Sequence, residues 1–172
     1  MEMLEQAVEA LKRGEQPDVE KPLSGGPEVN LHIPALIPDD YLPDVFTRLT
    51  LYKRIAGCKT GSQLDELQVE MIDRFGLLPV QVKQLFAVTA LRHRAQELGI
   101  QKIDAGKEFG KLEFSDRTAV DPLRIVQLVQ SAPARFKLLG ATGMRFSHDA
   151  ETPSDRINAV NQLLDTLSGK KQ

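Results

Sequence analysis

The chain has 172 residues, which is enough for one domain with a substantial core, and its 41% hydrophobic and 27% charged residues are ordinary for a globular protein. The formal net charge of −2 argues against a protein whose main task is to neutralise nucleic-acid phosphates. No apolar run approaches the roughly 20 residues of a membrane helix, and the acidic start lacks the features of a secretory signal, so we expect a cytoplasmic protein. A single cysteine, Cys58, excludes an internal disulfide framework.

The first 27 residues indicate a helix end followed by a linker. Leu4, Val8 and Leu11 recur at helical spacing, which predicts a helix over residues 1–13. Residues 14–27 carry prolines and glycines among acidic residues, a composition typical of a linker. We therefore expect residues 1–27 to come from a preceding domain and residues 28–172 to form the domain itself.

A strand and three helices are predicted next. Residues 28–36 alternate apolar and polar side chains, which indicates a half-buried strand, and Pro34 places its end at a sheet edge. Apolar residues then recur at helical spacing in three successive segments, with Thr60 and Ser62 offering N-caps to the second. These segments cover residues 43–57, 60–76 and 79–98.

The second half of the sequence predicts a hairpin followed by a helix, twice over. Strands are expected at residues 100–104, 111–115, 135–139 and 143–147, and the two helices begin after the caps Asp121 and Thr152. About five strands and six helices result. Their order predicts an α+β fold with helices followed by β-hairpin/helix units around a small, mainly antiparallel sheet.

No catalytic, cofactor-binding or metal-binding residues are predicted. His32, His93 and His148 lie in different elements, without the spacing of a metal site. The segment G-K-E-F-G-K at residues 106–111 has too few residues between its glycines for a phosphate loop and leads into a strand, so a hairpin turn is expected there. No serine stands in a nucleophile elbow.

A charged stripe on the second helix is the candidate site. Glu66, Glu70 and Asp73 fall at i, i+4 and i+7, opposite the predicted core face, and Arg74 lies beside them. Such a stripe is either a solvated surface or a surface that binds a partner. Acid/base catalysis by paired carboxylates is disfavoured, because a helix face opposite its own core provides no cleft to shift a pKa.

Three segments carry a resemblance to a known family. They are I-P-D-D-Y-L-P-D-V at residues 37–45, R-L-T-L-Y-K-R-I-A at residues 48–56 and E-M-I-D-R-F-G-L-L-P at residues 70–79. They closely resemble the C-terminal domain of bacterial transcription-repair coupling factor (Mfd), and the likeness runs from Glu2 through Ile100, with the same order of elements beyond. The resemblance implies a fragment of a multidomain DNA translocase, without the motor and therefore without ATPase activity.

The resemblance implies a regulatory role for this domain. In that family the C-terminal domain packs against the UvrB-like N-terminal region, masks the surface that binds UvrA, and restrains the motor until RNA polymerase is engaged on DNA. The matching E-x-x-D-R segment implies that Glu70, Asp73 and Arg74, together with Glu66, contact the UvrB-like domain. No cofactor and no membrane are implied, and we expect a monomer.

A nucleic-acid accessory domain is the alternative reading. It would use a basic patch made of Lys83, Arg92, His93, Arg94, Lys102, Lys107 and Lys111. The overall charge disfavours this alternative.

Overall fold

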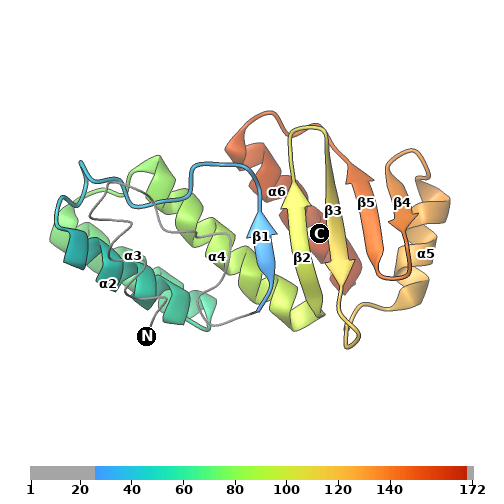
Figure 1. Ribbon diagram of the computed structural model, residues 1–172, viewed down its shortest axis with the longest axis horizontal. Coiled ribbons are helices and arrows are strands. Elements are labelled where there is room, and N and C mark those ends of the chain that lie inside the picture. The colour runs from blue at the N-terminus through green and yellow to red at the C-terminus, as the bar shows by residue number, and fades with distance from the viewer. Residues whose placement is uncertain (1–25, 170–172) are drawn as a thin grey trace. The chain divides into compact units, whose positions relative to one another are not determined.

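The computed structural model describes residues 26–169. The elements follow in the order β1 (Glu28–Asn30), α2 (Val45–Gly57), α3 (Gly61–Phe75), α4 (Val80–Leu98), β2 (Ile100–Ala105), β3 (Phe109–Phe114), α5 (Pro122–Ser131), β4 (Phe136–Leu139), β5 (Gly143–Ser147) and α6 (Pro153–Ser168) (Figure 1). The predicted α+β fold is confirmed. The helix expected over residues 1–13, and most of the linker that follows it, lie outside the described residues.

The described residues divide into two compact units. Residues 34–90 form one, called here the helical unit, and residues 26–33 with 91–169 form the other, called the sheet unit. The predicted boundary between residues 27 and 28 stays a prediction.

Capped amphipathic helices build the helical unit. The Asp44 carboxylate accepts a hydrogen bond from the Thr47 amide at the start of α2, and the Thr60 hydroxyl accepts one from the Gln63 amide at the start of α3. These caps satisfy amides that the first helical turn leaves unpaired. The buried Arg48 donates to the Leu42 carbonyl over 2.6 Å and so ties the segment before α2 to the helix.

One five-stranded sheet organises the sheet unit. The strand order is β1-β2-β3-β5-β4, with β1 parallel to β2 and every other pair antiparallel, so the expectation of a mainly antiparallel sheet is confirmed. Ile103, Leu112 and Met144 are fully buried on one face. α6 runs behind the strands in Figure 1, and its Val160 and Leu164 are fully buried as well. Among residues 26–169, side chains on the other face, such as Lys111 and Arg145, are exposed.

The turn between β2 and β3 is a hairpin, as predicted for residues 106–111. The Gly106 amide donates to the Phe109 carbonyl over 3.0 Å, and Gly110 pairs with Ala105. A Cβ at Gly110 would lie 2.8 Å from the Asp104 carbonyl oxygen and would also meet the Phe146 ring. Glycine is therefore required here by close packing of the next strand, and not by a bound phosphate.

The first strand is shorter than predicted. β1 ends at Asn30, whereas the alternation in the sequence extends to residue 36. His32 adopts a positive φ of 55°, which an extended ladder does not tolerate, and Pro34 has no amide hydrogen for strand pairing. The prediction for residues 31–36 was therefore wrong, because hydrophobic alternation says nothing of backbone handedness.

Candidate protein-interaction site

α3 presents the predicted stripe on a well-anchored helix. Leu64, Leu67 and Met71 are buried along one side, at the spacing that a helical face requires. Glu66 and Asp73 are exposed on the other side. The site is therefore held by a packed helix and not by a loop.

Glu70 is less available than the stripe predicts. Its carboxylate accepts a two-pronged contact from the Arg54 guanidinium of α2, in which Arg54 Nη2 and Glu70 Oε1 lie 2.7 Å apart, and Arg74 Nη1 approaches Glu70 Oε2 to 3.2 Å. Arg54 and then Arg74 lower the pKa of Glu70 to about 2 from the usual 4.5. Glu70 therefore braces α3 against α2, which the sequence analysis missed because Arg54 lies 16 residues away.

Arg74 belongs to the same cluster. Besides the contact with Glu70, its guanidinium lies over the Phe75 ring at 4.7 Å from the centroid, and its side chain is 54% exposed. Arg74 thus forms an intrahelical ion pair with Glu70, and its side chain is still more than half exposed.

The outermost face of α3 combines acid with apolar surface. Val69 is 59% exposed and Ile72 is 39% exposed. At 100° per residue Val69 falls on the side opposite Leu67 and Met71, and Ile72 falls on the flank of that side. The exposed acids Asp65, Glu66 and Asp73 surround them. Glu66 and Asp73 make no ion pair within residues 26–169. We call these five residues, 65, 66, 69, 72 and 73, the α3 outer face.

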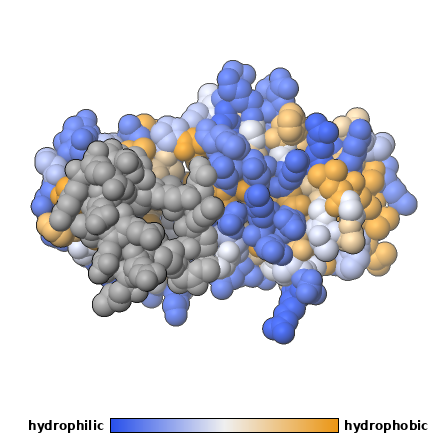
Figure 2. Space-filling model, viewed as in Figure 1, coloured by the Kyte–Doolittle hydropathy of each residue, from blue (hydrophilic) through white to orange (hydrophobic). Residues whose placement is uncertain are grey.

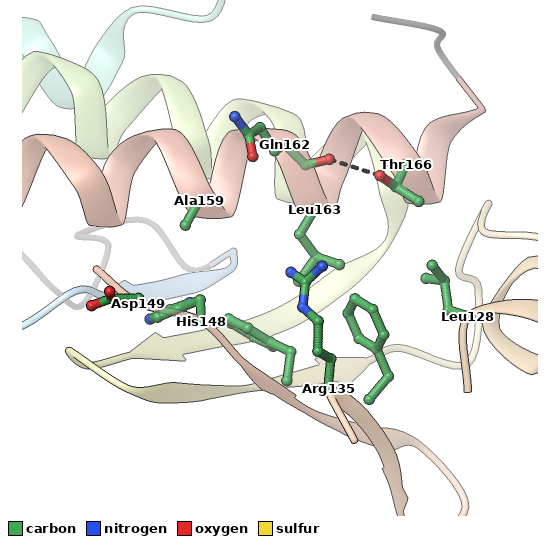
Figure 3. Close-up of a pocket in the computed structure, with 10 residues that line it drawn as sticks. Leu128, Arg135, His148, Asp149, Ala159, Gln162, Leu163 and Thr166 are labelled. Atoms are coloured by element: carbon green, nitrogen blue, oxygen red, sulfur yellow. Dashed lines mark hydrogen bonds between the residues drawn. The ribbon is translucent and has the colours of Figure 1, made fainter. Parts of the chain in front are cut away.

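A cavity in the sheet unit offers no catalytic arrangement. It measures about 440 Å³ and lies between α6 and the strands, with Arg135 and His148 in its wall (Figure 3). His148 Nε2 donates to the Gly106 carbonyl over 2.6 Å, and the Thr166 hydroxyl donates to the Gln162 carbonyl of its own helix. No nucleophile is therefore paired with a base in this cavity.

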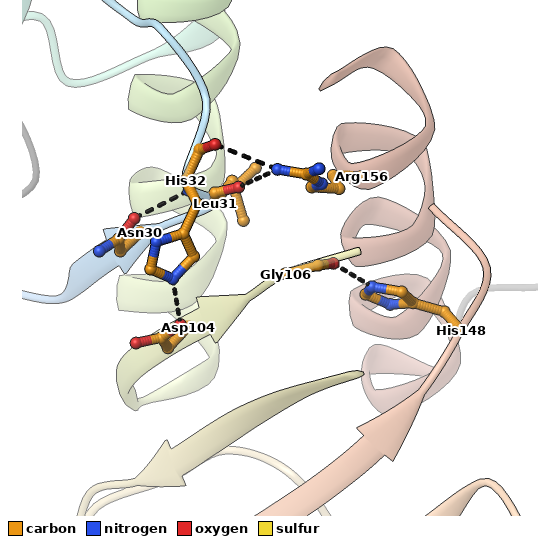
Figure 4. A network of polar contacts seen from close by, with 7 residues as sticks. All are labelled: Asn30, Leu31, His32, Asp104, Gly106, His148 and Arg156. Carbon is orange, nitrogen blue, oxygen red and sulfur yellow. Dashed lines mark hydrogen bonds and ion pairs between the residues drawn. The ribbon is translucent and has the colours of Figure 1, made fainter. Parts of the chain in front are cut away.

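A polar cluster joins the end of β1 to α6 (Figure 4). The guanidinium of the buried Arg156 donates to the carbonyls of Leu31 and His32 at 3.0 and 3.1 Å, and Nε donates to that of Ala150 at 3.1 Å. On the other side, His32 Nε2 donates to Asp104 Oδ1 over 2.7 Å. Every one of these contacts fixes backbone or neighbouring side chains, so the cluster is structural.

The residues of the alternative basic patch are divided between the two units, and some of them are engaged in contacts with acids. Lys83 belongs to the helical unit, whereas Arg94 is turned toward α6, where it contacts Asp165 and donates to Asn161 Oδ1 over 2.8 Å. Lys107 Nζ lies 3.7 Å from Glu151 Oε1. Only Lys102 and Lys111 stand on adjacent strands of the sheet.

Two further features bear on function. Within the part of the chain that the structure describes, no group of three or more His, Cys, Asp or Glu side chains is placed to hold a metal ion. Over the same residues, no helix combines the length and the apolar character needed to cross a membrane.

Comparison with known proteins identifies the family. Residues 31–125, more than half of the 172-residue chain, match the family model described as the TRCF domain. The transcription-repair-coupling factor of Escherichia coli K12 is 44% identical over 97% of this chain, and that of Haemophilus influenzae is 42% identical over 98%. The chain spans only 14% and 15% of the lengths of these two relatives.

A solved structure supports the same fold. The crystal structure of a C-terminal domain of transcription-repair coupling factor superposes with a TM-score of 0.64, covering 86% of this chain and 97% of that one. Its sequence identity is 21%, so it speaks to the fold alone. The chain belongs to the TRCF domain family of transcription-repair-coupling factors.

Proposed function

We propose that this chain is the C-terminal regulatory domain of a DNA translocase that couples transcription to nucleotide-excision repair. In this proposal it contributes no catalysis. It clamps onto the UvrB-like N-terminal region of the parent protein, masks the surface that binds UvrA, and restrains the motor until RNA polymerase is engaged. Membership of the TRCF domain family supports the general role, and the α3 outer face supplies a surface for the clamp.

The observation that carries the proposal is the uncovered apolar pair within an acidic helix face. Val69 and Ile72 are exposed although they lie on a helix with a well-formed core side. Apolar centres rimmed by charge are typical of protein interfaces, in which the apolar part contributes affinity and the charges fix orientation. The expected partner surface is therefore basic around a shallow apolar patch.

In this proposal the predicted contact residues have two roles. Glu66 and Asp73, which lack ion pairs within the described chain, are proposed to meet the cations of the UvrB-like region directly. Glu70 is proposed to act mainly by holding α3 on α2 through Arg54, and Arg74 to reach the partner from the rim. Several weak contacts suit a clamp that must open, because each exposed ion pair contributes at most about 1 kcal/mol.

Tethering makes such a weak clamp effective. A partner carried on the same chain is present at an effective concentration that reaches about millimolar. A loss of about 2 kcal/mol at the clamp would change the ratio of open to closed molecules by roughly 30-fold. We therefore expect weak binding between separate pieces and full closure in the intact parent.

Titration calorimetry of this chain against the separate UvrB-like region tests the proposal. Changing Glu66→Gln with Asp73→Asn should weaken binding roughly 5- to 30-fold, because two exposed charge contacts are lost. Val69→Ser with Ile72→Ser should weaken it about tenfold or more, because apolar burial is lost. The matched control is Glu97→Gln with Glu108→Gln, which removes the same charge from exposed positions of the sheet unit.

Measurements on the intact parent protein distinguish a contact that restrains the motor and masks the UvrA-binding surface from a contact without a regulatory effect. The Glu66→Gln, Asp73→Asn variant should raise both UvrA binding and ATP turnover in the absence of polymerase, while the control pair leaves both unchanged. If both variants bind the UvrB-like region as the unmodified chain does, the α3 outer face is not the clamp.

A further inference from the structure

The open face of the sheet carries a row of cations set directly against one another. Lys111 of β3 is the register partner of Arg145 of β5, and Arg145 is in turn the partner of Lys137 of β4. All three residues are exposed and share the face opposite the buried Leu112 and Met144. Neighbouring strands lie about 4.8 Å apart, so the Cα atoms of the three basic residues lie within about 10 Å.

This row is unfavourable for folding on its own. Like charges directly opposite in an antiparallel pair destabilise the sheet, and none of the three cations makes an ion pair within residues 26–169. Asp104 of β2 is the register partner of Lys111, but its Oδ1 accepts a hydrogen bond from His32. Glu113 is the register partner of Lys102, so Arg145 and Lys137 have no acid directly opposite them among the described residues. An anion bound along the row would relieve the repulsion.

An exposed aromatic ring completes the surface. Phe109 is 47% exposed on β3, two residues before Lys111, and the Arg145 guanidinium lies over its ring at 4.5 Å from the centroid. Figure 1 shows this face of the sheet in front of α6, and Figure 2 shows hydrophilic side chains over the middle strands with hydrophobic ones toward β4 and α5. We call Phe109, Lys111, Lys137 and Arg145 the sheet face.

We propose that the sheet face binds single-stranded nucleic acid, with the three cations along the phosphates and the stacked Phe109–Arg145 pair as a platform for a base. Open sheets that combine aromatic rings with basic side chains bind single strands in this way, because unstacked bases need a planar surface. An acidic peptide could pair with the cations, but it has no base to stack on the Phe109 ring. In a duplex the faces of the bases are already stacked on one another, so they cannot stack on this ring. The proposed nucleic-acid site shares no residue with the α3 outer face, and its function differs from that of the proposed clamp.

Fluorescence anisotropy with the 172-residue chain and a labelled single-stranded oligonucleotide of about 12 nucleotides tests the proposal. Binding should weaken between about 50 and 200 mM salt with a logarithmic slope near −2, as expected for about three phosphate contacts on a single strand. The triple variant Lys111→Gln, Lys137→Gln, Arg145→Gln should bind at least about 30-fold more weakly at 50 mM salt, since each cation contributes roughly threefold to tenfold.

Two sets of variants distinguish binding at the sheet face from nonspecific attraction to the chain's positive charges. The control triple Lys53→Gln, Lys59→Gln, Lys83→Gln removes the same charge from exposed positions of the helical unit and should change affinity less than about threefold. Phe109→Leu should lose about fivefold or more with an unchanged salt slope, and Phe109→Tyr should restore binding, because stacking needs a π-face. The single variant Lys137→Gln, on an edge strand, should show a partial loss even if the sheet-face triple folds poorly.

Four results would overturn the proposal. They are no binding by the unmodified chain at about 50 mM salt, equal losses in the two triples, tighter binding to a duplex of the same length, and tighter binding to a polyglutamate peptide. A failure here leaves the clamp untouched, because calorimetry with the UvrB-like region does not involve the sheet face.

Discussion

The α3 outer face and the sheet face both expose charge, but the chain assembles them in different ways. The α3 outer face lies within nine consecutive residues, 65–73, and follows from the helical period alone. The sheet face joins residues of three strands, with Lys111 and Arg145 lying 34 positions apart in the sequence, and follows from strand register. Periodicity within one element therefore reveals the first surface, whereas only pairing between elements reveals the second.

The largest expected effect comes from removing the support beneath each face. Met71 is on the buried side of α3 and Met144 is on the buried face of the sheet, and both are fully buried. Met71→Ala and Met144→Ala should each lower the free energy of unfolding by about 3 kcal/mol, because each leaves a cavity in a packed core. Urea unfolding measures the loss, and hydrogen exchange should show it first in the unit that carries the change.

Volume-conserving variants provide the control for this comparison. Met71→Leu and Met144→Leu should each lower the free energy of unfolding by less than about 1.5 kcal/mol. A loss below about 1 kcal/mol for either alanine variant would show that the face above it does not depend on that core position.

Arg156→Met is expected to have the next largest effect. The change keeps an apolar stem of similar length but removes the guanidinium that satisfies the carbonyls of Leu31, His32 and Ala150. Buried carbonyls left without a donor should lower the free energy of unfolding by about 2 kcal/mol. Arg117→Met, at an exposed position, is the control and should stay within about 0.5 kcal/mol in the same urea titration.

A smaller, pH-dependent effect should distinguish Glu70 from its neighbours on α3. The pKa of Glu70 is lowered from 4.5 to about 2, so its ion pairs stabilise the fold above pH 4.5 and are lost as the pH falls through about 2. Glu70→Gln should therefore be less stable than the unmodified chain near neutral pH, and the difference should shrink across that window. Thermal unfolding at a series of pH values measures it.

Glu66→Gln is the matched control, since it removes a carboxylate from the same helix without breaking an ion pair among the described residues. Its stability at neutral pH should stay close to that of the unmodified chain. Equal destabilisation by the two changes would contradict the bracing role given to Glu70.

Much of the fold could be predicted because the decisive signals are local. Capping residues such as Thr60, Asp121 and Thr152 each cap the helix they were expected to begin. The β4–β5 hairpin follows from its own alternation and turn. The early end of β1 could not be foreseen, because the positive φ of His32 is fixed by contacts with Asn30 and with Asp104, which is 72 positions away.

The candidate site was predicted only in part, for the same physical reason. Helical spacing located Glu66, Glu70 and Asp73 on one side of α3, but it could not show that Arg54 of another helix engages Glu70. The alternative basic patch followed the density of Lys and Arg along the chain, and this density says nothing of where side chains point. Arg94, for example, is turned toward Asp165.

The smallest expected effect tests the sheet face directly. Lys137→Gln removes the charge that stands opposite Arg145, so it should raise the free energy of unfolding by a few tenths of a kcal/mol. Lys102→Gln removes a charge that stands opposite Glu113 on the same face, so it should lower the free energy of unfolding by a similar amount. Both differences should vanish at about 1 M salt, where the screening length is near 3 Å. If both variants instead shift stability in the same direction, the sign of the neighbour across the strand is irrelevant, and the repulsion on which the nucleic-acid site was argued is absent.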